Sequence, residues 1–293
     1  MTLILGIDNV CYTHTMRSGQ MDLLGFLDRA TKYGAAVVQM DPLWPSQKLE
    51  LSESCLDYLH GLLKDRGLQI VVKGNSGGLG TLANPPEKAG NDLELFKSKI
   101  EAAAKLGSPV VRVVTRAYPY PTKHTQPSKG ISRDQVIDWV IHSLKELTPL
   151  AENLGIRIAV ENHGDLRIAE MERILAEVNS ASLGIQYDLL EQVAIFEDPF
   201  MAAERLLSSA FTVHWNDAYP ILSSSGFSVK PCMPGEGILK LDEVFNMIVV
   251  LSREIFCFTA FQADSMETED QLVYAYLVDL KERLRSHQTP EQS

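Results

Sequence analysis

The sequence predicts a single (β/α)8 barrel of the α/β class, and three observations support this prediction. Short β-branched runs alternate with longer segments of helical period along almost the whole chain. The 293 residues accommodate eight such strand–helix units, which matches the usual size of one barrel. No linker-like stretch divides the sequence into halves. We therefore expect residues 1–286 to form one barrel domain and residues 287–293 to form a disordered tail.

The expected strands are short runs rich in β-branched and other apolar residues. In order they are Leu3–Ile7, Ala35–Met40, Gln69–Lys73, Val110–Thr115, Arg157–Val160, Leu183–Tyr187, Phe211–His214 and Phe256–Phe261. Apolar residues recur at helical spacing between them, most clearly over Arg133–Asn153, where Ser132 and Gln135 fit a capping box. A doubly wound open sheet remains an alternative, because alternation alone does not distinguish open from closed sheets.

Composition and charge exclude or disfavour several classes of protein. The net charge is −11, from 27 basic and 38 acidic residues, which argues against a nucleic-acid partner. No apolar run approaches the roughly 18 residues of a membrane span, and Asp8 interrupts the first apolar stretch, which is therefore no secretory signal. The four cysteines form no CxxC pair. These features favour a cytoplasmic protein that acts on a small molecule.

Two connections between the expected elements are unusually long. They span residues 116–131 and 216–240, and each follows a predicted strand. Long connections are often functional, and barrel enzymes use the loops at the carboxyl ends of their strands. We expect both segments to lie over the mouth of the barrel and to shield the site from water.

Polar residues stand at the ends of the last four predicted strands, namely Glu161, Asp188, His214 and Gln262. Side chains alternate between the two faces of a strand. The residue before each is large and apolar, and the residue two before is small or polar. The same parity therefore directs all four side chains into the barrel. Two carboxylates, an imidazole and an amide oxygen suit one divalent ion such as Mn²⁺, Mg²⁺ or Co²⁺.

These strand ends, the motifs IAVENHGD and VHWND, and the PGEG sequence at residues 234–237 resemble the sugar isomerase/epimerase family of xylose-isomerase-like TIM barrels. The resemblance covers residues 3–284 and implies one divalent metal held by Glu, Asp, His and Glu at strand ends. Glu161, Asp188 and His214 match the first three ligands. Gln262 stands where the family usually has glutamate, and Asp264 shares its parity.

Several other residues are candidates for substrate contact or catalysis. His163 lies two residues after Glu161 and is either a general acid/base or an orienting group. Lys73 and Arg112 either hold a substrate oxyanion or phosphate or form ion pairs within the barrel. In the second long connection, Lys230 and Glu236 are expected to contact substrate, Lys230 by its place in the resemblance. The segment GNSGGLG does not match a dinucleotide-binding motif.

A metal that binds a hydroxy-ketone acidifies the neighbouring C–H, so the sequence predicts an isomerase, epimerase or dehydratase acting on a carbohydrate-like substrate through an enediolate. Because an amide cannot carry a proton at neutral pH, Gln262 cannot be a second base. This favours one-face chemistry, with Glu161 or His163 as the base. The alternatives are a metal phosphodiesterase like the apurinic endonucleases and a non-catalytic barrel that binds a sugar or a partner. The oligomeric state stays open, including a homo-oligomer.

Overall fold

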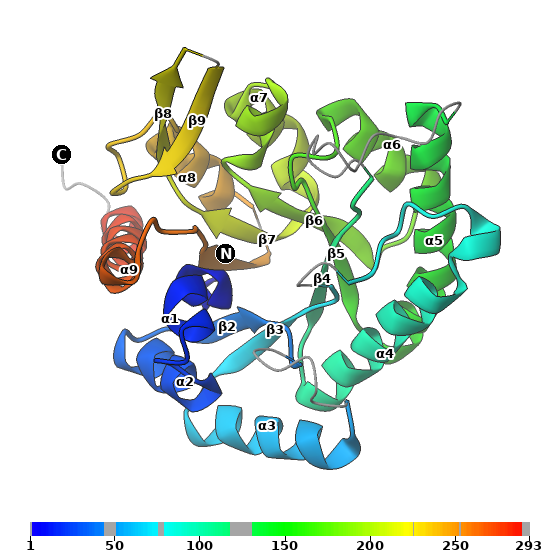
Figure 1. The fold of residues 1–293 in the computed structure, drawn as a ribbon, viewed down its shortest axis with the longest axis horizontal. Coiled ribbons are helices and arrows are strands. Elements are labelled where there is room, and N and C mark those ends of the chain that lie inside the picture. Colours follow the sequence, from blue (N-terminus) through cyan, green and yellow to red (C-terminus); the bar gives the residue numbers. More distant parts are fainter. Residues whose placement is uncertain are drawn as a thin grey trace.

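Eight parallel strands close into a barrel in the computed structural model, which describes residues 2–43, 51–75, 79–117, 131–224, 226–251 and 253–288. Around the barrel the strand order is β1-β10-β7-β6-β5-β4-β3-β2 (Figure 1). Their bounds are β1 Thr2–Asp8, β2 Val37–Met40, β3 Gln69–Lys73, β4 Val110–Val114, β5 Arg157–Glu161, β6 Leu183–Asp188, β7 Ala210–Trp215 and β10 Glu254–Thr259. The predicted closed barrel is therefore confirmed, and the open sheet is excluded.

Helices surround the barrel and cover its outer face (Figure 1). They are α1 Thr13–Arg17, α2 Leu23–Lys32, α3 Glu53–Asp65, α4 Gly90–Leu106, α5 Arg133–Leu154, α6 Ile168–Val178, α7 Pro199–Leu206, α8 Leu241–Val249 and α9 Met266–Gln288. The predicted capping box at the start of α5 is present, with Ser132 and Gln135 bonding reciprocally. Within the described segments, no helix is both long and apolar enough to cross a membrane.

The inside of the barrel is divided into an apolar floor and a polar mouth. Its apolar cluster consists of Val37, Val71, Val110, Ala159, Phe211, Phe256 and Phe258. Along β5, Ala159 belongs to this floor, and Glu161 follows two residues later on the same side of the strand. A buried strand can thus supply packing at one end and a functional carboxylate at the other.

Residues 216–240, predicted to be a long loop, contain an antiparallel hairpin. Its strands are β8 Ala218–Ser223 and β9 Gly226–Pro231, and they form a sheet separate from the barrel. Figure 1 shows the hairpin projecting beside α7 and α8. The serine-rich turn and the prolines at either end of the segment hid the strand pattern.

Two sequence-based expectations fall largely on segments that are not described. In the predicted lid at residues 116–131, residues 118–130 lie outside the described residues. In the predicted tail, α9 continues to Gln288, two residues beyond the expected end of the barrel domain. Residues 289–293 also lie outside the described part of the chain.

Candidate functional site

Three adjacent strands bring Glu161, Asp188 and His214 together inside the barrel mouth. Glu161 and Asp188 end β5 and β6, and the strand register pairs Asp188 directly with His214 of β7. All three are buried, and one ligand atom from each lies within 4.8 Å of the other two. Nδ1 of His214 is 2.8 Å from Oδ2 of Asp188 and 3.6 Å from Oε1 of Glu161. One nitrogen and two carboxylates thus converge on one point.

The other ring nitrogen of His214 faces two buried, hydrogen-bonded side-chain amides, those of Gln39 and Gln186, which we call the amide relay. Its Nε2 lies 2.6 Å from Oε1 of Gln39, a β2 residue. The Gln39 amide donates to Oε1 of Gln186 at 2.5 Å, and the Thr212 hydroxyl donates to the same oxygen at 3.0 Å. Because Gln39 presents its oxygen, Nε2 must carry a hydrogen, and Nδ1 is the nitrogen that can give up its proton and bind a metal.

Ion pairs set the charge of the buried carboxylates around this triad. Burial alone would raise the pKa of Glu161, but Arg112 of β4, His163 and His214 together hold that pKa well below its usual range. On the other side of the mouth, Lys73 is paired with Asp8 and bonds Oδ1 of Asn9 at 2.8 Å. The carboxylates of Glu161 and Asp8 are therefore charged at neutral pH.

Neighbouring charged groups also shift the pKa values of Asp8 and His214. Burial opposes ionisation of Asp8, yet Lys73 and His214 bring its pKa to about 2. Burial also disfavours the charged imidazole of His214, but hydrogen bonds to Asp188 and Asp8 raise its pKa to about 9. Oδ2 of Asp8 lies 3.3 Å from Nε2 of His214 and so reinforces the amide relay rather than joining the triad.

His163 stands above the triad with two carboxylates beside it. Its Nδ1 is 3.1 Å from Oε1 of Glu191 and 3.4 Å from Oε1 of Glu161. Burial lowers the pKa of the imidazole, but these two carboxylates outweigh burial and raise the pKa well above its usual value. His163 is partly exposed and lines the same cavity as the triad, so it can exchange a proton with a molecule bound there.

Gln262 lies at the rim of the site, in an exposed position, and lines the cavity there. The last strand was predicted to reach Phe261, but β10 ends at Thr259. Strand register pairs Phe258 with His214, so Gln262 is four residues beyond the level of the imidazole. The inward positions of β10 nearest the triad are Phe258 and Ala260, which offer no side-chain ligand.

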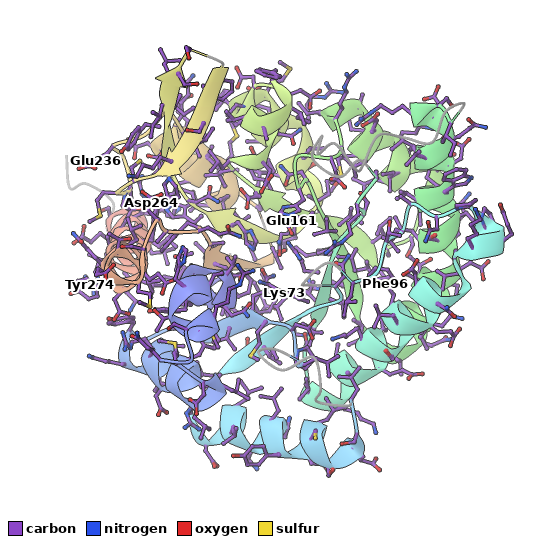
Figure 2. All side chains as sticks on the ribbon, viewed as in Figure 1. Lys73, Phe96, Glu161, Glu236, Asp264 and Tyr274 are labelled. Atoms are coloured by element: carbon purple, nitrogen blue, oxygen red, sulfur yellow. The ribbon has the colours of Figure 1, made fainter. Side chains whose placement is uncertain are left out.

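A cavity of about 520 Å³ joins most of the predicted site residues. Its lining includes Asp8, Lys73, Arg112, Glu161, His163, Asp188, His214, Gln262 and Asp264. Figure 2 shows Glu161 and Lys73 near the centre of the barrel view and Glu236 near its margin. Lys230 forms an ion pair with Asp264 at the rim. Glu236 is exposed and does not line this cavity.

Three polar residues next to the predicted ligands were not recognised from the sequence. Asn162 bonds the backbone of Asp188 in both directions, at 2.6 and 2.9 Å, and Asn216 donates to Oδ1 of Asp188 at 3.0 Å. Asp217 accepts the backbone N–H groups of Gly235 and Gly237, each at 3.0 Å, and so folds the PGEG turn. Asn162 directly follows Glu161 in the ENH motif, and Asn216 and Asp217 lie two and three residues after His214 in the HWND motif, which was the available signal.

Comparisons with known proteins agree with this architecture. An uncharacterized protein, YihM of Escherichia coli (strain K12), is 21% identical over 165 residues, which is 56% of this chain. The match covers 47% of YihM, so the chain spans about half the length of this curated relative. The structure of IolI with a bound zinc atom superposes with a TM-score of 0.72 and 18% identity, over 96% of this chain and 98% of that one.

The structure of D-psicose 3-epimerase in the presence of D-fructose gives a TM-score of 0.70 and 13% identity. The superposition covers 96% of this chain and 99% of that one. At such identities these likenesses show the fold alone. The family model described as "Xylose isomerase-like TIM barrel" matches residues 27–271. Since this match spans most of the chain, the protein belongs to the family of xylose isomerase-like TIM barrels.

Proposed function

We propose that this protein is a divalent-metal-dependent enzyme that isomerises, epimerises or dehydrates a sugar or sugar-like hydroxy-ketone. The observation that carries the proposal is the convergence of His214 Nδ1 with the Asp188 and Glu161 carboxylates in the barrel mouth. Sugar epimerases among the structures of the same fold support the same class of chemistry.

The residues present fit a metal ion. One imidazole nitrogen and two carboxylate oxygens suit Mn²⁺, Co²⁺, Mg²⁺ or the Zn²⁺ seen in IolI. The Gln39 relay keeps a hydrogen on Nε2 of the imidazole, so that Nδ1, which faces the carboxylates, can bind an ion once it has lost its proton. When bound there, a divalent ion would polarise a carbonyl and a neighbouring hydroxyl of the substrate and so acidify the C–H between them.

Glu161 and His163 are suited to different roles. Arg112 pairs with Glu161 and stabilises its charged form, which makes this carboxylate a good ligand and a weak base. His163 reaches into the cavity, where the carboxylates of Glu191 and Glu161 favour its protonated form, so this imidazolium can donate a proton to a substrate oxygen. We therefore assign ligation to Glu161 and proton transfer to His163.

The charge of the cavity favours an uncharged substrate. Its lysine and arginine side chains each have a carboxylate partner, Lys73 with Asp8 and Arg112 with Glu161, and Lys230 at the rim pairs with Asp264. A phosphate would have to compete with these carboxylates for the same cations. The ion-pair interpretation of Lys73 and Arg112 is thus better supported than phosphate binding, and a neutral keto-sugar fits best.

The multi-metal phosphodiesterase is less well supported. Among the described residues, the triad is the one group of histidine, cysteine and carboxylate side chains close enough together to hold a metal. A cluster of two or three ions needs additional ligands. The acidic balance of the chain also opposes a nucleic-acid substrate.

The proposal is tested by replacing Asp188 with alanine and measuring metal content together with solvent deuterium exchange into a panel of keto-sugars. We expect Asp188→Ala to lose bound metal and exchange while it keeps its circular dichroism spectrum. The control is Asp57→Ala, which removes an exposed carboxylate on α3 and should change neither. Metal binding by Asp188→Ala at the level of the parent would refute the assignment.

A further inference from the structure

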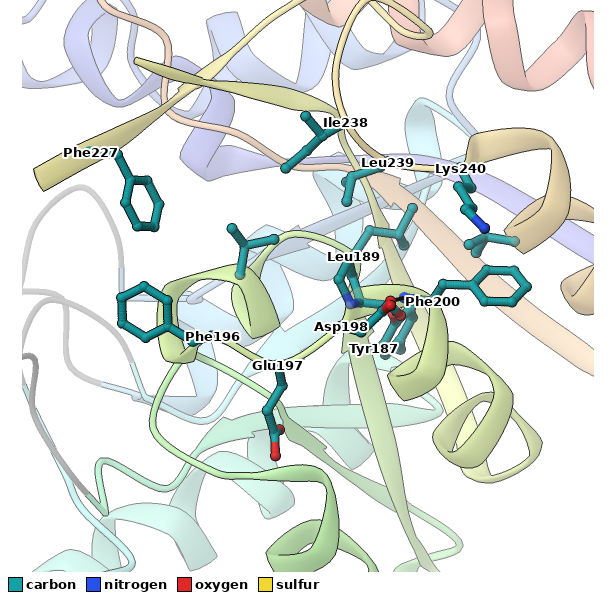
Figure 3. A pocket seen from close by; sticks show the side chains of 13 residues that line it. Tyr187, Leu189, Phe196, Glu197, Asp198, Phe200, Phe227, Ile238, Leu239 and Lys240 are labelled. Carbon is teal, nitrogen blue, oxygen red and sulfur yellow. Dashed lines mark hydrogen bonds between the residues drawn. The ribbon is translucent and has the colours of Figure 1, made fainter. Parts of the chain in front are cut away.

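A second cavity lies outside the barrel, beneath the hairpin. It has a volume of about 470 Å³ and lies between the 3-10 helix η3 (Glu191–Ile195), the hairpin and the start of α8 (Figure 3). Most of its lining is apolar or aromatic, and the side chains that matter here are Leu189, Val193, Phe196, Phe200, Phe227 and Ile238. We call it the hairpin groove. Its volume is in the range of small-molecule sites.

Large apolar side chains at the edge of the hairpin groove are exposed. Phe196 is 83% exposed, Ile238 47% and Phe227 40%. The rings of Phe196 and Phe227 stand edge to face with centroids 5.7 Å apart, and Figure 3 shows both at one end of the groove. Exposed apolar residues scattered singly are ordinary, but a concave cluster of them is typical of a ligand site.

The charged groups that line the hairpin groove already interact within the protein. Lys240 pairs with Glu243 and stands over the ring of Phe200. Oε2 of Glu197 accepts the backbone N–H of Ile168 at 2.9 Å and the Gln192 amide at 2.8 Å. Asp198 caps α7 through the backbone N–H of Phe200 at 2.8 Å. The groove therefore offers a ligand mainly hydrocarbon and aromatic surface.

The hairpin groove adjoins the cavity that contains Glu161, Asp188 and His214, here called the catalytic cavity, along two segments. Phe227, Val229 and Pro231 alternate along β9 and so share one face of the strand. Phe227 lines the groove, whereas Val229 and Pro231 line the catalytic cavity. On the opposite side, Glu191 lines the catalytic cavity, and Val193, two residues later, lines the groove. The two cavities therefore lie next to each other along these two segments.

We infer that the hairpin groove binds an apolar or aromatic substituent of the substrate whose keto-sugar part occupies the catalytic cavity. The substrate class is then a keto-glycoside with an apolar aglycone rather than a free sugar. This inference rests on the proposed function. The neutral charge of the reacting part and the hydrocarbon surface of the groove both agree with such a molecule.

The test compares two probes, methyl and phenyl 3-keto-β-D-glucopyranoside, by calorimetric titration of the full chain with and without Mn²⁺. The variants are Phe227→Ala and, as a matched control, Leu222→Ala. Leu222 pairs with Phe227 across the hairpin and is more exposed, but it does not line the groove. Burial of a phenyl ring should make the phenyl probe bind about tenfold more tightly than the methyl probe.

We expect Phe227→Ala to abolish this preference and Leu222→Ala to retain it. Equal affinity for both probes in the parent would overturn the inference, even where Mn²⁺-dependent binding of both supports the proposed function. A phenyl preference that depends on Phe227 but not on Mn²⁺ would support the groove and count against the proposed function. Light scattering supplies a further outcome: a dimer that Phe227→Ala dissociates would show that a second copy fills the groove, and the inference would fail.

Discussion

Replacing Gln39 with methionine tests whether the amide relay prepares His214 for a metal. The substitution conserves length but removes the 2.6 Å contact to Nε2 and the donor to Gln186. Residues that orient a metal-bound histidine are typically worth about 10- to 100-fold in metal affinity. Oδ2 of Asp8, 3.3 Å from the same nitrogen, can take over part of this role. We therefore expect a loss of about tenfold, or about 1.4 kcal/mol.

Competition titration with Co²⁺ measures the affinity. The imidazole of His214 is neutral above its pKa of about 9, and ¹⁵N NMR of the metal-free protein at such a pH reports which of its nitrogens keeps the hydrogen. The control is Ser143→Ala, which removes one buried hydrogen bond, to Leu82, on the outer side of the barrel. It should lower stability by about 1 kcal/mol and leave Co²⁺ affinity unchanged. Unchanged affinity in Gln39→Met, with Nε2 still protonated, would refute the reasoning.

Two further predictions concern a buried carboxylate and the fourth ligand. Burial raises the pKa of Asp165 to about 6 against 3.8 when unfolded, so the folded state binds this proton more tightly, and stability should fall as pH rises from about 4 to about 6. In urea unfolding measured at a series of pH values, Asp165→Asn should remove most of this fall in the free energy of unfolding. At pH 7 the variant should be more stable than the parent by up to about 3 kcal/mol. The same pH dependence in variant and parent would contradict the prediction. Ala260→Glu should tighten Co²⁺ binding more than Gln262→Glu, because Ala260 is nearer the level of His214 on the inward face of β10; the reverse order would restore Gln262 as the better position.

The barrel and its inward-facing polar residues could be predicted because both depend on local periodicity. Because side chains alternate along a strand, Glu161 and Asp188 point into the barrel when Val160 and Tyr187 pack against the helices. The structure has this arrangement. The end of β10 was predicted two residues too late. Ala260 and Phe261 continue the apolar composition of the strand, and sequence alone does not show where its hydrogen bonding stops.

The partners of the triad could not be predicted in the same way. Gln39 lies 175 residues before His214 in the sequence, and only barrel closure brings β2 across from β7. The pairing of Lys73 with Asp8 likewise joins strands that the sequence describes separately. Each of these residues looks like an ordinary polar interruption of a strand until the closed sheet makes them neighbours.

The apolar character of β10 beside the triad bears on how the site would hold a metal. Glu161 and Asp188 supply two negative charges, which balance one divalent ion, but Arg112 already draws on the charge of Glu161. A third carboxylate, placed on β10 as a fourth ligand, would restore that charge, but at the level of His214 the strand instead presents Phe258. Asp8 does not replace it, because it faces Nε2, the nitrogen directed away from the other ligands. Three protein ligands leave more of the ion's coordination shell to substrate oxygens, so metal and substrate should each bind more tightly in the presence of the other.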